Sequence, residues 1–257
     1  ANFHPIARSR RAESEAIWRL LEIAKKLSCP IYIVHISTKE GIEKIFEYKK
    51  SGTKIFVETC PHYLILNEEK YKSPDFEPAK YVMTPPLRKN EDNLALWNHL
   101  NCTIDVLATD HCSFNFKGQK DLGLANFAKI PSGIGSVEHR IPLIYTFGVL
   151  ENKIDITRMV QLISENPARI FGLYPQKGLL AIGSDADILV FDPKKDNTIS
   201  VNTHHQNQDY NPYEGIRVWG KPKYVFLRGE LALDGDNFMG VNGRFIKRRR
   251  IDYPTTL

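Results

Sequence analysis

The stretch IYIVHISTKE, residues 31–40, determines which class of fold this sequence favours. Its first four residues are all apolar, which is typical of a short strand buried on both faces inside a parallel sheet. Ser37 and Glu40 then have the spacing of a capping box, which signals the start of a helix. The stretch therefore predicts one β/α unit, with His35 at the carboxyl end of its strand.

The same alternation of strand and helix extends from Ser9 to about residue 173. We predict further strands at 54–58, 81–83 and 104–109, and helices at 12–27, 94–100, 155–163 and 167–171. A (β/α)8 barrel closes only with eight units, and this sequence holds about four. Residues 1–176 are thus predicted to form half of a barrel, or else an open sheet. The absence of a starting methionine suggests a piece of a longer chain.

The pattern changes after Lys177, where helical stretches stop. Short apolar runs at 179–182, 187–191, 216–219, 224–227 and 230–233 are separated by turns rich in Gly, Pro and Asp. Such runs without helical crossovers are typical of antiparallel strands. We predict a small β module over residues 177–257.

The composition excludes several classes of protein. With 42% hydrophobic and 25% charged residues the chain is an ordinary globular one, not a disordered or fibrous one, and no apolar run is long enough for a membrane span. The net charge of +5 is concentrated in terminal clusters at 8–11 and 247–250, which are typical of solvated ends rather than of a nucleic-acid surface. Four cysteines without a CxxC pair favour reduced thiols in the cytoplasm over a zinc site.

Three candidate metal ligands follow three different strands. His35 ends the first strand, His62 follows the second, and Asp110 ends the strand at 104–109. In barrel enzymes the reactive groups project from the carboxyl ends of the strands, and two imidazoles with a carboxylate suit Zn²⁺. A hydrogen-bonding structural role for each histidine and a helix-capping role for Asp110 remain open on spacing alone.

A series of motifs along the whole chain resembles the dihydropyrimidinase and hydantoinase family of the amidohydrolase superfamily. They are YIVHIS at 32–37, ETCPHYL at 58–64, YVMTPPLR at 81–88, ATDHC at 108–112, IPSG at 130–133, VEHR at 137–140, NPARIFGLYP at 166–175, GSDAD at 183–187, THHQ at 203–206 and YEG at 213–215. Many separate motifs in the right order make the resemblance specific. It implies the second half of a metal-dependent TIM barrel together with a small C-terminal β-sandwich.

The resemblance also implies an activity and roles for individual residues. Such enzymes hydrolyse a cyclic amide, a dihydropyrimidine or a hydantoin, to an N-carbamoyl amino acid with two divalent metal ions, usually zinc. By position, His35 and His62 resemble the histidines of one metal, and Asp110 resembles the aspartate that ligates the other and shuttles a proton. Backbone groups at Thr84 and Ser132 are expected to hold the substrate ring, although the family more often has Ser and Asn there. The expected assembly is a homotetramer, with no nucleic-acid or membrane partner.

Part of the family's site is missing from these 257 residues. No His-x-His pair occurs, and that pair and the carboxylated bridging lysine are expected in residues that precede Ala1. Two alternatives remain: a non-catalytic dihydropyrimidinase-related scaffold protein, which would not need His35, His62 and Asp110, and an allantoinase or dihydroorotase. The sequence does not distinguish dihydropyrimidines from hydantoins as the substrate.

Overall fold

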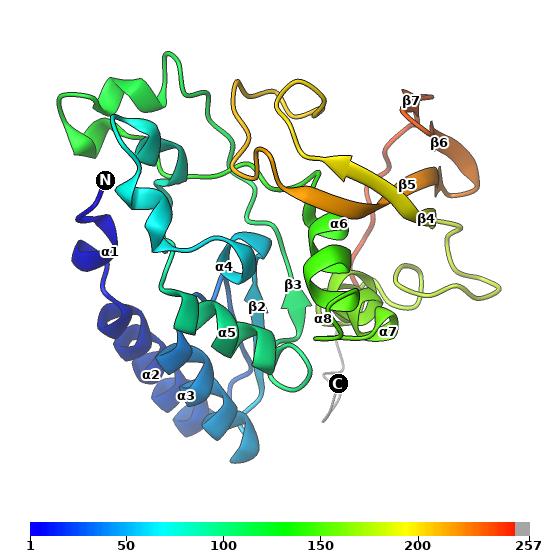
Figure 1. Ribbon diagram of the computed structural model, residues 1–257. Coiled ribbons are helices and arrows are strands. Elements are labelled where there is room, and N and C mark those ends of the chain that lie inside the picture. The colour runs from blue at the N-terminus through cyan, green and yellow to red at the C-terminus, as the bar shows by residue number, and fades with distance from the viewer. Residues whose placement is uncertain (250–257) are drawn as a thin grey trace. The chain divides into compact units, whose positions relative to one another are not determined.

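The computed structural model describes residues 1–249 (Figure 1). The chain divides into two compact units, one formed by residues 1–140 and 198–216 and the other by residues 141–197 and the segment from 217 onward. The predicted domain boundary between residues 176 and 177 stays a prediction. The predicted β module, to residue 257, and the basic cluster at 247–250 extend beyond the described residues.

The first unit is built around a parallel sheet of three strands in the order β1 (Ile31–Ile33), β2 (Ile55–Thr59) and β3 (Val106–Leu107). Both pairs are parallel, with Ile31 opposite Ile55 and Glu58 opposite Val106. Because parallel strands run the same way, their carboxyl ends lie at one edge of the sheet, as the sequence predicted.

Three longer helices accompany this sheet: the amphipathic helices α2 (Arg10–Leu27) and α3 (Lys39–Lys50), and α5 (Asn90–His99), which buries polar as well as apolar side chains. Figure 1 shows α2 and α3 side by side, and their contact is among the most extensive in the unit. Leu21, Ile42, Ile45 and Val57 are fully buried. This alternation of buried strands and amphipathic helices confirms the predicted α/β class. The shorter elements are α1 (His4–Ala7), α4 (Pro61–Ile65), η1 (Glu68–Lys72), η2 (Glu77–Tyr81), η3 (Lys120–Gly123) and η4 (Phe127–Lys129).

The start of α3 differs from the prediction by one residue. Its N-cap is Thr38, whose hydroxyl accepts from the Gly41 amide at 3.2 Å, instead of Ser37. The Ser37 hydroxyl instead donates to the carboxylate of Glu13 on α2, which also accepts from the backbone amides of Ser37 and Thr38 at 2.9 and 3.1 Å. A residue distant in sequence thus takes the place of the predicted capping box.

The strand predicted at 81–83 is wrong. Tyr81 ends the 3-10 helix η2, and the residues that follow form a loop. The Val82 carbonyl accepts from the Gly133 amide at 3.0 Å, and the Met83 carbonyl accepts from the ring of His4 at 2.7 Å. These two carbonyls therefore accept hydrogen bonds from a loop amide and from a side chain, and not from a neighbouring strand.

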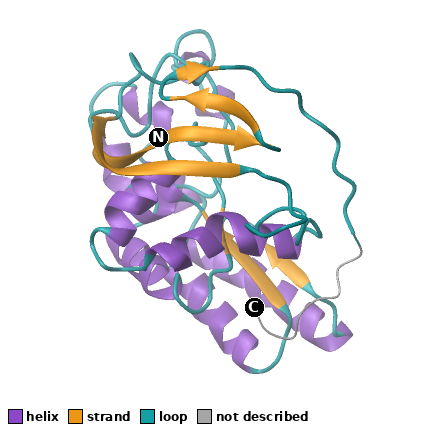
Figure 2. Cartoon of the chain, turned by 90° about the vertical axis from the view of Figure 1, so that its right-hand side faces the viewer, coloured by secondary structure: helices purple, strands orange, loops and turns teal. Residues whose placement is uncertain are grey.

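The second unit combines short helices with a four-stranded sheet (Figure 2). The strands lie in the order β4 (Ile188–Thr198), β5 (Arg217–Leu227), β6 (Glu230–Asp234) and β7 (Asn237–Phe238), and β6 is antiparallel to both β5 and β7. The helices are α6 (Arg140–Ile144), η5 (Tyr145–Val149), α7 (Ile156–Val160), η6 (Gln161–Glu165) and α8 (Asn166–Ile170).

Two details of the predicted β module need correction. The strands predicted at 216–219 and 224–227 are one strand, β5, because Gly220 and Pro222 lie within it without ending it. The stretch 179–182 forms no strand: the chain turns at residues 182–183, and the side chains of Leu180 and Ile182 are exposed instead of buried in a sheet. Within residues 1–249, no helix is both long and apolar enough to cross a bilayer.

Candidate metal centre and substrate loops

His35 and Asp110 occupy equivalent places just beyond β1 and β3. Both have left-handed backbones, with φ of 40° and 45°. Residues other than glycine rarely adopt this conformation, and where they do they are enriched at functional sites. The loop of His35 is held to β2 by two hydrogen bonds of 2.8 Å, from the Ile36 amide to the Glu58 carbonyl and from the Thr59 hydroxyl to the Ile36 carbonyl.

His62 lies in the first turn of α4, directly after β2. Its side chain has no exposed surface, and neither ring nitrogen has a hydrogen-bond partner among the described residues. The ring packs against Tyr63, with centroids 4.2 Å apart. A buried polar group without a partner is costly and calls for an explanation. An imidazole with free nitrogens fits a metal ligand, so the chemistry of this residue suits the predicted ion.

Electrostatic effects connect His35 with His62, and Asp110 with Cys60, near the carboxyl end of β2. Burial, with a smaller effect from His35, lowers the pKa of His62 to about 3. Burial is also the main cause that raises the pKa of Cys60, and the charge of Asp110 contributes to that shift. Across residues 1–249, however, no group of three or more His, Cys, Asp or Glu side chains lies close enough to hold a metal ion. The assignment of His35, His62 and Asp110 as metal ligands stays a prediction.

The two predicted substrate-binding residues lie together. The Ser132 hydroxyl is 3.3 Å from the Thr84 hydroxyl, to which it donates a hydrogen bond. Both residues are exposed, while the neighbouring segments are bound through the Gly133 amide and the Val82 carbonyl. Residues 84 and 132 thus form one accessible surface within the first unit.

Sequence reasoning missed Lys120, which lies beside this surface. Its ammonium donates to the carbonyls of Val82 and Pro131, both at 3.0 Å. A single lysine in a polar stretch carries no sequence signal for burial. Its position becomes informative only when the segments at 82 and 131 are known to be neighbours.

The remaining histidines near the strand ends have structural partners. The Nδ1 atom of His111 accepts from the amides of Ser136 and Val137 at 3.0 and 3.2 Å. His139 is buried, and its Nε2 atom accepts from the Asn211 amide group at 2.8 Å. Burial lowers the pKa of His139 to about 4, so it is neutral at pH 7.

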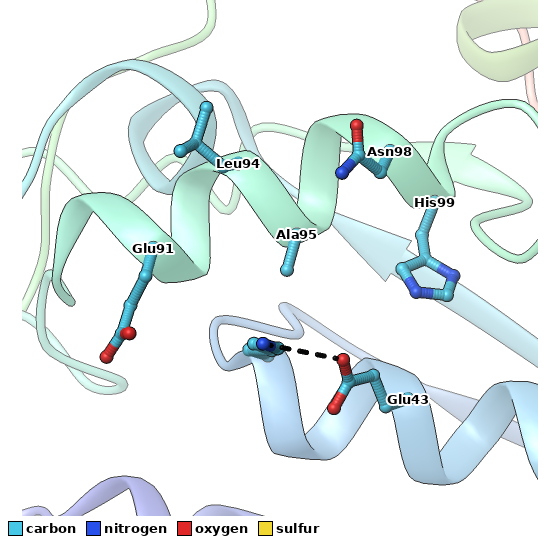
Figure 3. Close-up of a pocket in the computed structure, with 7 residues that line it drawn as sticks. Glu43, Glu91, Leu94, Ala95, Asn98 and His99 are labelled. Atoms are coloured by element: carbon cyan, nitrogen blue, oxygen red, sulfur yellow. Dashed lines mark ion pairs between the residues drawn. The ribbon is translucent and has the colours of Figure 1, made fainter.

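A cavity of about 340 Å³ lies between α3 and α5 (Figure 3). Its lining includes Glu43, Glu91, Asn98 and His99, and Glu43 pairs with Lys39 at 3.8 Å. None of the five predicted site residues lines it. The cavity is therefore a surface feature of the helices and separate from the candidate site.

Comparison with known proteins places this arrangement in a family. Residues 32–232 match the model of the amidohydrolase family, and the chain therefore belongs to that family, whose members are generally metal-dependent. Within the family it is similar to D-hydantoinases and dihydropyrimidinases, which confirms the resemblance seen in the sequence motifs.

Two curated relatives and one solved structure illustrate the similarity. The chain is 43% identical to D-hydantoinase from Ralstonia pickettii, covering 96% of this chain and 55% of the relative. It is 40% identical to D-hydantoinase from Geobacillus stearothermophilus, covering 96% and 53%. The crystal structure of dihydropyrimidinase from Brevibacillus agri aligns with a TM-score of 0.96 at 41% identity, over 98% of this chain and 56% of that one. The chain thus spans about half the length of these relatives.

Proposed function

We propose that the full-length protein carrying this chain, called the parent enzyme below, is a metal-dependent cyclic amidase. It hydrolyses hydantoins or 5,6-dihydropyrimidines to N-carbamoyl amino acids. The observation that carries the proposal is the buried His62, whose ring nitrogens have no partner among the described residues, near His35 at the ends of adjacent strands. The names of the similar proteins, D-hydantoinase and dihydropyrimidinase, support the same chemistry.

In this proposal His35 and His62 hold one divalent ion, and Asp110 helps to hold a second. Zinc is the proposed metal. When bound, such ions lower the pKa of water from 15.7 to about 7 and polarise a carbonyl oxygen. The remaining ligands, a His-x-His pair and a carboxylated lysine, come from the rest of the parent enzyme.

Asp110 is the proposed proton carrier. Its carboxylate is exposed at the end of β3, where water and substrate can reach it. It accepts the proton of the attacking water as the new carbon–oxygen bond forms. It then returns that proton to the ring nitrogen as the carbon–nitrogen bond breaks. Such general acid–base catalysis typically contributes about 10²–10⁴-fold.

Thr84 and Ser132 are the proposed contacts to the ring. The amide edges of a hydantoin or dihydropyrimidine present N–H donors and C=O acceptors, which backbone groups of these segments can match. Both residues are exposed and close to one another, which suits a small polar ligand between the segments. In keeping with the resemblance of the sequence motifs, the parent enzyme is proposed to be a cytoplasmic homotetramer.

A panel of substrates tests the proposal. The purified parent enzyme is assayed with hydantoin, dihydrouracil, allantoin and dihydroorotate, before and after removal of metal by a chelator. We expect N-carbamoyl products from hydantoin or dihydrouracil, loss of activity on chelation and recovery with zinc. Hydrolysis of allantoin or dihydroorotate alone would assign a different cyclic amidase, and a metal-loaded protein inert to all four would support the scaffold alternative.

A further inference from the structure

Lys120 is a fully buried lysine next to the proposed substrate surface. None of its surface is exposed. Its ammonium donates to the carbonyls of Val82 and Pro131, both at 3.0 Å, and lies 5.9 Å from the centre of the Phe114 ring. Lysine is almost never fully buried unless its charge is paired, and no carboxylate bonds this ammonium among the described residues. A buried cation held by two backbone carbonyls therefore calls for a specific role.

The two carbonyls belong to the segments that carry Thr84 and Ser132. Val82 lies two residues before Thr84, and Pro131 directly precedes Ser132. The Val82 carbonyl also accepts from the Gly133 amide at 3.0 Å. Lys120 and this amide thus join the same two segments, and no other side chain is seen to bridge their backbones within residues 1–249.

The segment that presents Lys120 is itself held in place. The Lys120 amide donates to the Asn115 carbonyl at 3.1 Å, and the amides of Phe116 and Lys117 donate to the carboxylate of Asp209 at 2.6 and 2.9 Å. The Phe116 ring packs against the buried cluster of Ala79, Val82 and Ile130. The ammonium is therefore presented by a segment that is itself held in place. Lys120 can set the distance between the two backbone segments only if its own segment is fixed.

We propose that Lys120 is a positioning residue that sets the spacing between the backbone segments at 82–84 and 131–133, and through it the fit of the cyclic amide ring. This inference rests on the proposed function, because the two segments are the proposed ring contacts. Lys120 does not touch the substrate in this account. Burial lowers the pKa of Lys120 to about 8, so its ammonium form still predominates at pH 7.

The first test measures kinetics in the parent enzyme. Lys120→Met keeps most of the side chain's length but removes both hydrogen bonds. We expect KM for hydantoin or dihydrouracil to rise about 10-fold or more, because binding of the ring is weakened equally in the ground state and the transition state. The value of kcat should change much less, and metal content should stay the same. Lys120→Gln, which can still donate to a carbonyl, should fall between.

Lys117→Met provides the matched control. Lys117 is in the same segment, and its side chain is exposed. This variant should keep the KM of the unmodified enzyme. An unchanged KM in both Lys120 variants, or a loss confined to kcat or metal content, would overturn the positioning role.

The second test measures hydrogen exchange and does not depend on activity. In Lys120→Met the Gly133 amide should exchange at least about 10-fold faster, because its segment loses the Lys120 bridge and keeps only the Gly133–Val82 and Ser132–Thr84 hydrogen bonds. Lys117→Met should leave that rate unchanged. Equal rates in both variants would overturn the inference. A parent enzyme that hydrolyses no cyclic amide would instead refute the proposed function, which separates the two failures. Should Lys120→Met fail to fold, the Lys120→Gln variant decides both measurements.

Discussion

The hydroxyl of Ser132 donates a hydrogen bond to the hydroxyl of Thr84 at 3.3 Å, across a separation of 48 residues in the sequence. These are the two residues proposed to contact the substrate ring. The hydrogen bond joins the segments that carry them. This contact supports a common substrate surface built from the loop after η2 and the loop after η4.

The histidines at the strand ends are predicted to control metal content. In the parent enzyme His35→Ala and His62→Ala should each reduce the metal per subunit from two ions toward one, because each removes an imidazole ligand. His99→Ala is the control, since His99 bonds to Thr103 instead. Metal analysis of the three purified variants makes the comparison. Retention of two ions in both the His35 and His62 variants would remove these residues from the metal site.

Asp110→Asn is predicted to separate ligation from proton transfer. An amide can still offer a carbonyl oxygen to an ion, but it cannot accept a proton at neutral pH. Turnover by the parent enzyme should fall by about 10²–10⁴-fold and should not recover with excess zinc. The assay is hydrolysis of dihydrouracil across a zinc titration, with metal content read in parallel. Recovery to within a few-fold at saturating zinc would leave Asp110 as a ligand only.

The 257-residue chain alone is predicted to be inactive. It has no His-x-His pair, and the part that the structure describes holds no cluster of three metal-binding side chains. Assays with hydantoin and dihydrouracil, with and without zinc, should give no product above background. Turnover by the isolated chain at ordinary enzymatic rates would show that the missing ligands are not needed.

The carboxylate of Glu13 is predicted to be a major contributor to stability. It pairs with Arg88, whose side chain is only 4% exposed, at 3.0 Å, and it holds the start of α3. Removing one partner of a buried pair leaves an uncompensated charge, so Glu13→Ala should reduce the free energy of unfolding by about 3–5 kcal/mol. Glu69→Ala, which breaks an exposed pair with Lys72, should change it far less, because solvent screens that pair. Urea unfolding of the parent enzyme measures both, and similar losses would contradict the account.

Acid is predicted to destabilise the first unit through His139. Its folded-state pKa of about 4 lies below the ordinary value of 6.5, so the unfolded chain binds the proton more readily. The stability that His139 contributes is fully present above about pH 6.5 and is lost as the pH falls toward 4. By pH 5 the free energy of unfolding should have fallen by about 2 kcal/mol from this cause. His139→Gln keeps an acceptor for Asn211 but cannot titrate. Its unfolding free energy should therefore fall less between pH 7.5 and 5, and equal losses would exclude His139 as the cause.

Much of the first unit could be predicted from the sequence because its strands and helices have strong local signals. β1 and β2 are nearly continuous apolar runs, and α2 has a regular apolar stripe. Where tertiary contacts override local preference, prediction failed. Val82 and Met83 look like strand residues, but their carbonyls bond to Gly133 and His4.

The candidate site was predictable in part for a similar reason. The carboxyl ends of parallel strands lie at one edge of a sheet. The positions of His35 and Asp110 after two such strands therefore predicted that both lie at this edge. Burial could not be anticipated in the same way. The lack of partners at His62 and the enclosure of Lys120 depend on segments distant in sequence, and no local pattern encodes such contacts.

The location of metal in crystals of the parent enzyme tests the central claim most directly. Anomalous diffraction at the zinc absorption edge identifies each bound ion and its ligands. We expect one zinc ion with ring nitrogens of His35 and His62 at about 2.0–2.1 Å, and a second with the Asp110 carboxylate at about 2.0–2.2 Å. Zinc ions bound by none of these three residues would contradict the claim.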